Sequence, residues 1–415
     1  MSRATTTSQL RQGRFLYKLG MLAIAPMLLF AACSSGDDGA APPPSSNNPP
    51  PSGSTANQFA YIIDAGTSEI RAVTMDGTTG DLATVAGSSP ISTGSFPHDV
   101  DVDLQGKYVY VSNHDSSFVS GFLITQSGSL TPINPAATGS PVTNLAGTDA
   151  TENQPHSSVM DQNGQFLYVV AGVGPGVSTL KAYQIQTAAG PGQGTLTAMA
   201  GQSFSVGVHG HRVRMSPNGQ FLYVASEDSG EVYAFSRNTS TGNLTPSAIP
   251  KVTGLMGATD VAIAPTNNFL FASYTNAVEV MSIGPDGSPT RIAPVSTFST
   301  NNNLQGSGPH AIAIRQNGQS LYTANINANT VSVFSVNTAT GVLTEIQVPN
   351  PTTGGDPNFV YIHPNGAVLY TADTRQSSNQ ISKFTINADG TLTATTPIPS
   401  SIVGIGPNGI RSTIK

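Results

Sequence analysis

A short sequence pattern recurs seven times between residues 58 and 415, and this repetition restricts the possible folds more than any other feature of the chain. Each copy centres on an aromatic residue in a segment such as YVYVSN or FLYVAS. The central aromatic residues, separated by 48 to 58 positions, are Tyr61, Tyr110, Tyr168, Tyr223, Phe271, Tyr322 and Tyr370. A period of about fifty residues is typical of a β-propeller in which each repeat supplies four strands.

Each copy predicts two β-hairpins. In one copy, an alternating segment that begins at His211 leads through the turn SPNG into the aromatic strand. A second alternating segment, EVYAFSR from Glu231, is followed by NTSTGNLTP, whose glycine can adopt the positive φ that such a turn needs. We therefore predict an all-β fold, a seven-bladed β-propeller of four-stranded antiparallel blades over residues 58–415. An open β-solenoid or several sandwiches would be the alternatives.

The two ends of the repeat region complement each other. The first copy begins near Asn57 without the alternating strand that precedes the turn in the other copies. The segment GPNGIRSTIK follows the last copy and resembles that missing strand. We expect Ile410 to Ile414 to form the innermost strand of the first blade and so to close the ring.

Composition excludes several kinds of partner and site. The chain has 17 basic and 23 acidic residues, a net charge of −6, and no basic cluster that could neutralise a run of phosphates, so we expect no nucleic acid partner. Only 10% of the residues are charged, which disfavours long amphipathic helices and coiled coils. The single cysteine excludes an intramolecular disulfide and a cysteine-based zinc site.

Residues 1–32 resemble a bacterial lipoprotein signal peptide. A basic region that ends at Lys18 precedes the apolar stretch Leu19 to Ala32, and Cys33 follows two alanines. The resemblance implies cleavage before Cys33, lipidation of this residue and, because Ser34 follows it, a place in the cell envelope at the outer membrane. An ordinary secretory signal is the alternative.

Residues 33–57 carry no aromatic or large aliphatic side chain. Such a segment cannot bury enough surface to offset the entropy of ordering. It is expected to be a disordered tether between the lipidated Cys33 and the propeller.

One repeat position is rich in histidine. It lies eight residues before the turn glycine or asparagine and holds His98, His156, His211, Thr259, His310 and Asn358, with Asn408 matching it in the C-terminal segment. In a propeller this position opens the innermost strand, and the residue sixteen positions later ends the neighbouring strand, so both should meet at one face near the axis. The later positions include His114 and Glu227, and His209 lies two residues before His211. These side chains either cap backbone groups in each blade or form a binding or catalytic cluster.

The segments YVSN, YVAS, YTAN and YTAD, with their PH…PNG lead-in, resemble those of lactonase-type seven-bladed propellers, which include bacterial 6-phosphogluconolactonases, and the related Tyr-Val-Thr-Asn repeat proteins. One blade of that family carries an Arg–His pair before the inner strand and a Glu at the end of the next strand. The resemblance implies that His211 or Glu227 is the catalytic base and that Arg212 binds substrate anions. In a regular strand, His211 and Arg212 would point to opposite faces. The remaining candidate ligand-binding residues are His98, His114, His156, His209, His310 and Asn358.

Three functions remain open from the sequence. The first is a lactonase-like hydrolase for a lactone or sugar-like ligand, which needs a base and a donor for the developing oxyanion but no cofactor. The second is a non-catalytic binding propeller for an envelope protein or glycan. The third is metal binding by the histidines, since imidazole suits copper and zinc, but their spacing contains no local ligand motif, so we predict no metal.

Overall fold

The computed structural model describes residues 58–133, 154–172, 176–292, 297–299, 308–374 and 379–413. The chain divides into two compact units, residues 1–44 and 45–415, and every described residue belongs to the second. The predicted signal peptide and tether, including Cys33, lie outside the described residues. Among the residues that are described, no helix is long and apolar enough to cross a membrane.

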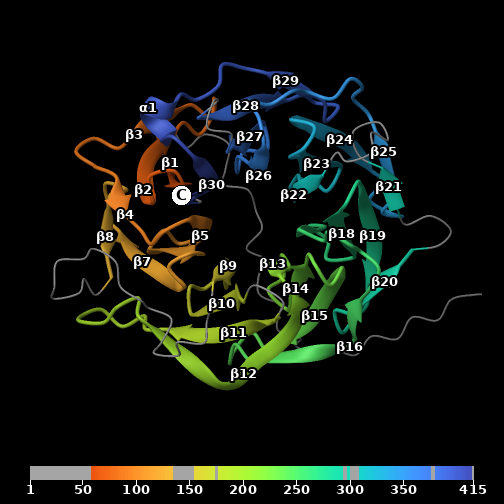
Figure 1. The fold of residues 1–415 in the computed structure, drawn as a ribbon, viewed down its shortest axis with the longest axis horizontal. Helices are drawn as coiled ribbons and strands as arrows, with labels where there is room; N and C mark the ends of the chain where they lie inside the picture. The colour runs from red at the N-terminus through yellow and green to blue at the C-terminus, as the bar shows by residue number, and fades with distance from the viewer. Residues whose placement is uncertain are drawn as a thin grey trace, which may run out of the picture. The chain divides into compact units, whose positions relative to one another are not determined.

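The described strands form seven antiparallel sheets around a common axis, as the sequence predicts (Figure 1). The second blade consists of β5 (Pro97–Val102), β6 (Tyr108–Asn113), β7 (Phe118–Ile124) and β8 (Leu130–Pro132). The third consists of β9 (Pro155–Met160), β10 (Phe166–Ala171), β11 (Val177–Ile185) and β12 (Leu196–Val208). The fourth consists of β13 (Gly210–Met215), β14 (Phe221–Ser226), β15 (Glu231–Arg237) and β16 (Leu244–Val252). The fifth blade consists of β17 (Asp260–Ile263), β18 (Phe269–Tyr274), β19 (Ala277–Ile283), β20 (Pro289–Arg291) and β21 (Thr297–Ser299). The sixth consists of β22 (Pro309–Ile314), β23 (Ser320–Asn325), β24 (Thr330–Val336) and β25 (Leu343–Glu345). The seventh consists of β26 (Pro357–Ile362), β27 (Val368–Asp373), β28 (Gln380–Ile386) and β29 (Leu392–Ala394).

The first blade combines strands from both ends of the propeller sequence. It contains β1 (Gln58–Asp64), β2 (Glu69–Met75), β3 (Leu82–Thr84), β4 (Ile91–Ser92) and the C-terminal β30 (Pro407–Ser412). Ile410 is fully buried opposite Ile62, so the predicted closure of the ring is confirmed. The strand begins three residues before the predicted Ile410, and Ile414 lies outside the described residues. A four-residue helix, α1 (Ser400–Val403), precedes this strand.

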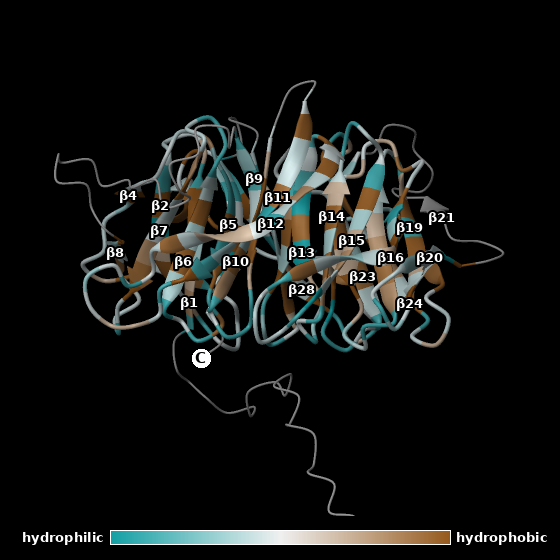
Figure 2. Ribbon diagram, turned by 90° about the horizontal axis from the view of Figure 1, so that it is seen from below, coloured by the Kyte–Doolittle hydropathy of each residue, from teal (hydrophilic) through white to brown (hydrophobic). Residues whose placement is uncertain are grey.

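The hydrophobic core lies between neighbouring blades. Tyr61 and Ile63 of β1, for example, pack in one buried cluster with Val109 and Val111 of β6 and with Phe122 of β7. Brown, hydrophobic segments lie mainly on the strands in Figure 2, while teal segments recur in the loops. Each blade therefore buries its apolar faces only when both neighbours are in place.

The central aromatic residue of a blade also forms a polar contact with the next blade. In six blades this residue is a tyrosine whose hydroxyl donates to the carbonyl of a glycine in the turn between the two outer strands of the next blade. The pairs are Tyr61 with Gly128, Tyr110 with Gly194, Tyr168 with Gly242, Tyr223 with Gly287, Tyr322 with Gly390 and Tyr370 with Gly80. The fifth blade has Phe271 at this position, and the equivalent turn glycine of the sixth blade is Gly341.

Candidate active site at the mouth of the propeller

A β-bulge directs the histidine-rich repeat position toward the mouth. In the second blade, Pro97 pairs with Asn113 and Asp99 pairs with Ser112, which leaves His98 as an extra residue in the inner strand. The same irregularity occurs at His98, His156, His211, His310, Asn358 and Asn408. Thr259 lies immediately before β17. Because a bulge changes the direction of a side chain at the end of a strand, it brings these residues to one face around the axis.

Most of these side chains bind the backbone of a neighbouring blade. His98 Nδ1 lies 2.8 Å from the carbonyl oxygen of His156, and His211 Nδ1 lies 2.9 Å from that of Thr259. Because a carbonyl can only accept, Nδ1 carries the proton in both rings. Three further residues bind in the same direction around the axis: His310 to the Asn358 carbonyl, Thr259 to the Pro309 carbonyl and Asn408 to the Pro97 carbonyl. These contacts match the interpretation that the repeat position caps backbone groups.

His156 differs from the other members of this position. Its side chain is buried, and neither ring nitrogen has a hydrogen-bond partner among the described residues. The centre of its ring lies 4.7 Å from that of His98, 4.6 Å from that of His114 and 4.8 Å from that of His209. His211 lies 5.4 Å away and in turn contacts His310. The structure thus brings together all six histidines that the sequence placed at the mouth.

Burial keeps the inner histidines neutral. Loss of hydration lowers the pKa of His98, His156 and His211 well below the usual range, and it lowers the pKa of His310 to about 4. The positive charge of Arg212 acts in the same direction on all four groups. At neutral pH these imidazoles therefore present lone pairs and N–H groups without charge.

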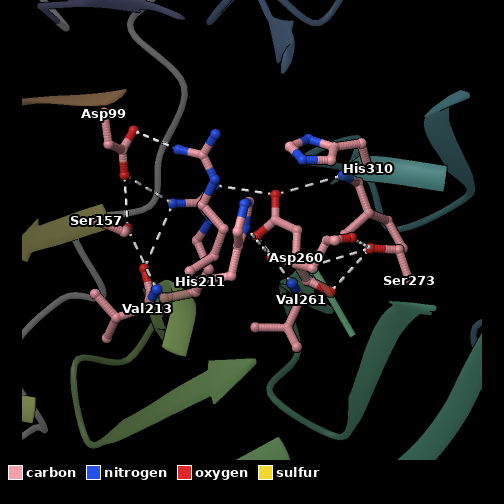
Figure 3. Close-up of polar contacts among 12 residues, drawn as sticks. Asp99, Ser157, His211, Val213, Asp260, Val261, Ser273 and His310 are labelled. Atoms are coloured by element: carbon pink, nitrogen blue, oxygen red, sulfur yellow. Dashed lines mark hydrogen bonds and ion pairs between the residues drawn. The ribbon is translucent and has the colours of Figure 1, made fainter. Parts of the chain in front are cut away.

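A buried network of charges lies among the inner strands. Arg212 has no exposed surface, and its Nη1 lies 3.0 Å from Oδ1 of Asp99. Arg214 lies 3.0 Å from Asp260 and 3.7 Å from Asp99. Figure 3 shows Asp99 and Asp260 among these contacts, with Ser157 donating to Asp99 at 2.6 Å. Arg212 is therefore sealed from solvent and paired with Asp99 in this arrangement, and the role of substrate ligand that the resemblance implies stays a prediction.

Glu227 and His209 form a more accessible pair at the mouth. Oε2 of Glu227 lies 3.4 Å from Nδ1 of His209, and the two side chains are 33% and 28% exposed. Asp228 approaches the same nitrogen at 3.5 Å. Partial burial raises the pKa of Glu227. His209 adopts a positive φ of 57°, as do Phe96, Gln154 and Asp356 at the equivalent position of other blades, so this conformation belongs to the repeat.

A hollow of about 670 Å³ opens on the same face. Its lining includes His98, Asn358 and Asn408 of the repeat position, and Ile326 and Thr374 from the ends of the adjoining strands. These last two are the residues that the sixteen-residue spacing pairs with His310 and Asn358. The hollow is large enough for a small ligand.

The sequence located the mouth but did not identify the buried charge network. Asp99, Arg214 and Asp260 come from three blades, and their contacts could not be inferred without the fold. A signal was nevertheless present, since Asp99, Arg212 and Asp260 each directly follow the histidine-rich position. Charged residues that recur at one position of an inner strand must face one another across the axis.

Comparisons with known proteins agree with this architecture. The family described as "Lactonase, 7-bladed beta-propeller" matches residues 52–354. A 6-phosphogluconolactonase of Bacillus subtilis is 25% identical over 295 residues, which cover 70% of this chain and 67% of the relative. A 6-phosphogluconolactonase of Yersinia pestis is 26% identical over 64% of this chain and 73% of its own length.

Solved structures share the fold at lower identity. A putative 6-phosphogluconolactonase from Bacteroides fragilis superimposes with a TM-score of 0.68 and 19% identity, covering 88% of this chain and all of that one. The periplasmic gluconolactonase PpgL of Pseudomonas aeruginosa gives a TM-score of 0.68 at 16% identity and covers 86% of this chain and 99% of its own. With its seven blades, its ring closure and the family match over most of its length, this chain belongs to the lactonase family of seven-bladed β-propellers.

Proposed function

We propose that this protein hydrolyses a lactone at the mouth of its propeller. The observation that carries the proposal is the Glu227–His209 pair, a carboxylate of raised pKa beside an imidazole at the mouth. The hollow opens on the same face but is lined by other residues. The relatives support this reaction class, because several of them are named 6-phosphogluconolactonases.

In the proposed reaction, Glu227 accepts a proton from water while the water oxygen attacks the lactone carbonyl carbon. The negative charge that develops on the carbonyl oxygen is stabilised by hydrogen-bond donors. The ring C–O bond then breaks, and the ring oxygen leaves with the proton that Glu227 took from water. The product carries a hydroxyl group and a carboxylic acid, which ionises to a carboxylate by releasing its proton to solvent.

His211 is the less suitable base. Its Nδ1 proton is committed to the Thr259 carbonyl and its ring is 3% exposed, whereas a third of the Glu227 side chain is accessible. Arg212 acts through its neighbours in this proposal, as a buried positive charge that favours neutral imidazoles. It is a positioning residue, not a substrate ligand.

Residues 1–57 extend the proposal to location. The lipoprotein-like signal, Cys33 and the polar tether support export and a lipid anchor in the cell envelope, at the outer membrane. A small lactone outside the cytoplasm is then the natural substrate class.

The proposal is tested by assaying the purified protein against neutral and phosphorylated δ-lactones of sugar acids and against aliphatic γ-lactones. Acid release above the spontaneous rate, saturable in substrate and abolished by Glu227→Gln, is the expected result. Absence of hydrolysis across the panel would overturn it.

One observation favours a non-catalytic binding propeller as the second candidate. The buried position of Arg212 and its ion pair with Asp99 remove the cation that the resemblance assigns to substrate anions. In that case the mouth would bind an envelope glycan or protein without turnover, and a ligand of the panel would bind but stay intact.

A further inference from the structure

His98, His156 and His211 form a compact cluster that the proposed hydrolysis does not use. One ring nitrogen from each lies within 4.8 Å of the others, and the three side chains are only 7%, 4% and 3% exposed. They open the inner strands of three consecutive blades, β5, β9 and β13. The sequence alone showed no ligand motif because 58 and 55 residues separate them along the chain.

Two of the rings have a hydrogen-bond partner of the kind that metal-binding histidines usually have on their second nitrogen. His98 and His211 each donate Nδ1–H to a backbone carbonyl, which leaves the lone pair on Nε2. Metal-binding histidines usually have such a partner on the second nitrogen, because it fixes the tautomer and orients the ring.

The third ring provides the observation that points to a ligand. His156 is buried, yet neither of its nitrogens has a partner among the described residues. Buried polar atoms in folded proteins are nearly always satisfied. The capping contacts that account for His98, His211 and the other members of this repeat position therefore do not account for His156.

We infer that His98, His156 and His211 bind one transition-metal ion of the zinc and copper class through three imidazole nitrogens. Such ions prefer imidazole, and zinc is frequently held by three protein ligands with one position open. Metal–nitrogen distances of 2.0–2.1 Å place tetrahedral ligand atoms about 3.3 Å apart, so modest ring rotations would complete the site.

The surroundings are compatible with a cation. The charge of Arg212, which lies close to all three rings, is opposed by the Asp99 carboxylate 3.0 Å away. His98 also lines the hollow, so a bound ion would border the space available to a ligand. The inference is independent of the proposed hydrolysis, since Glu227 and His209 are not among the three ligands.

The test uses untagged, chelator-treated protein titrated separately with Zn²⁺ and Cu²⁺, with Mg²⁺ as the comparison ion. Isothermal calorimetry and elemental analysis after gel filtration should give one ion per chain for Zn²⁺ or Cu²⁺ and none for Mg²⁺. Binding should raise the melting temperature.

His156→Asn is the diagnostic variant, because asparagine already occupies this repeat position at Asn358 and Asn408 and so suits the fold. It should weaken metal binding by more than about 100-fold, since even loss of an outer partner of a ligand costs 10–100-fold. The matched control is His363→Ala, which removes a buried histidine just past the far end of its inner strand, β26 (Pro357–Ile362), and should leave binding unchanged.

A second variant, His98→Asn, guards against misfolding of the first and should show the same loss. Saturable binding that persists in both folded variants would overturn the inference, as would a wild-type protein that takes up no ion. Loss of lactone hydrolysis in Glu227→Gln with metal binding intact would separate this site from the proposed catalytic pair.

Discussion

The hydroxyl oxygen of Tyr322 lies 2.9 Å from the carbonyl oxygen of Gly390 in the next blade and donates a hydrogen bond to it. Five other blades repeat this contact, and the fifth blade lacks it because Phe271 has no hydroxyl. Both partners of the contact are held by the repeat, the tyrosine by its strand and the glycine by a turn with positive φ. The propeller is thus joined at its blade boundaries by one recurring bond as well as by apolar packing.

This contact makes a paired prediction about stability. Tyr322→Phe leaves the buried Gly390 carbonyl without its donor and should lower the free energy of unfolding by about 1–2 kcal/mol. Phe271→Tyr should add the missing bond to Gly341 and raise it by about 1 kcal/mol. Urea unfolding followed by circular dichroism measures both changes. A destabilised Phe271→Tyr variant would show that the fifth blade cannot accept the hydroxyl.

The C-terminal strand makes a prediction about ring closure. Deletion of Gly409 to Lys415 removes the buried Ile410 from the first blade and leaves β1 without its inner partner. The loss should amount to several kcal/mol, and the exposed strand edge should promote aggregation. Ile410→Ala, which keeps the strand, should cost about 2–5 kcal/mol. An unchanged melting temperature of the truncated protein would contradict this account of closure.

The neutral histidines make a prediction about pH. The pKa of His310 falls to about 4 on folding, compared with about 6.5 in the unfolded chain, so the unfolded state binds the proton first as the pH falls. The contribution of His310 to the free energy of unfolding is therefore at its maximum above pH 6.5. Between pH 6.5 and 4 it decreases by about 1.4 kcal/mol per pH unit. His98, His156 and His211 act in the same direction.

The measurement compares urea unfolding of the wild type and His310→Asn at pH 7.5, 6.5 and 5.5. Burial raises the pKa of Asp101 to about 7, and this group works against the histidine effect in both proteins. The difference between the two proteins removes the Asp101 contribution. The stability of His310→Asn should fall less steeply with acid, and equal slopes would show that His310 titrates normally.

The proposed catalytic pair makes a kinetic prediction. On any lactone that the wild type hydrolyses, Glu227→Gln should remove most of kcat, by about 10²–10⁴-fold, because the amide keeps the shape but cannot accept a proton. The pKa of Glu227 is raised, so kcat/KM of the wild type should decline with acid starting above the usual range of a glutamate. His363→Ala, just past the far end of the inner strand β26, should retain full activity. Full activity in Glu227→Gln would shift attention to His98 and His114, whose ring centres lie 6.2 Å apart.

The N-terminal sequence makes a prediction about location. The wild-type protein should fractionate with membranes and carry lipid on Cys33, whereas Cys33→Ser should be released. Mass spectrometry of the mature N-terminus checks the modification. Unchanged membrane association of the Ser variant would rule out the anchor.

The fold was predictable because its information is repeated. Seven aromatic positions with a near-constant period identify the blades. The strand that the first copy lacks and the C-terminal segment supplies indicates the closure. The site was predictable only as a location. A regular strand would send His211 and Arg212 to opposite faces, but the bulge between Gly210 and Arg212 changes the register at that point, and nothing in the local sequence distinguishes it.

The pairing partners around the axis were also hidden from the sequence. The imidazole of His209 contacts Glu227 and His156, and these contacts depend on a left-handed residue and on the packing of adjacent blades. Likewise, the burial of Arg212 follows from its ion pair with Asp99 two blades away. Contacts of this kind depend on the three-dimensional arrangement of the blades, which leaves no periodic pattern in the sequence.

The pairing of β1 with β30 also determines when the ring of blades can close. Residues 58–64 meet their inner partner only after more than 300 further residues have been made available, so the last blade boundary cannot form on a partly emerged chain. Contacts of such long sequence separation form slowly. The ring therefore stays open until its final strand is available, and until then the apolar faces at the open blade boundary are exposed to solvent.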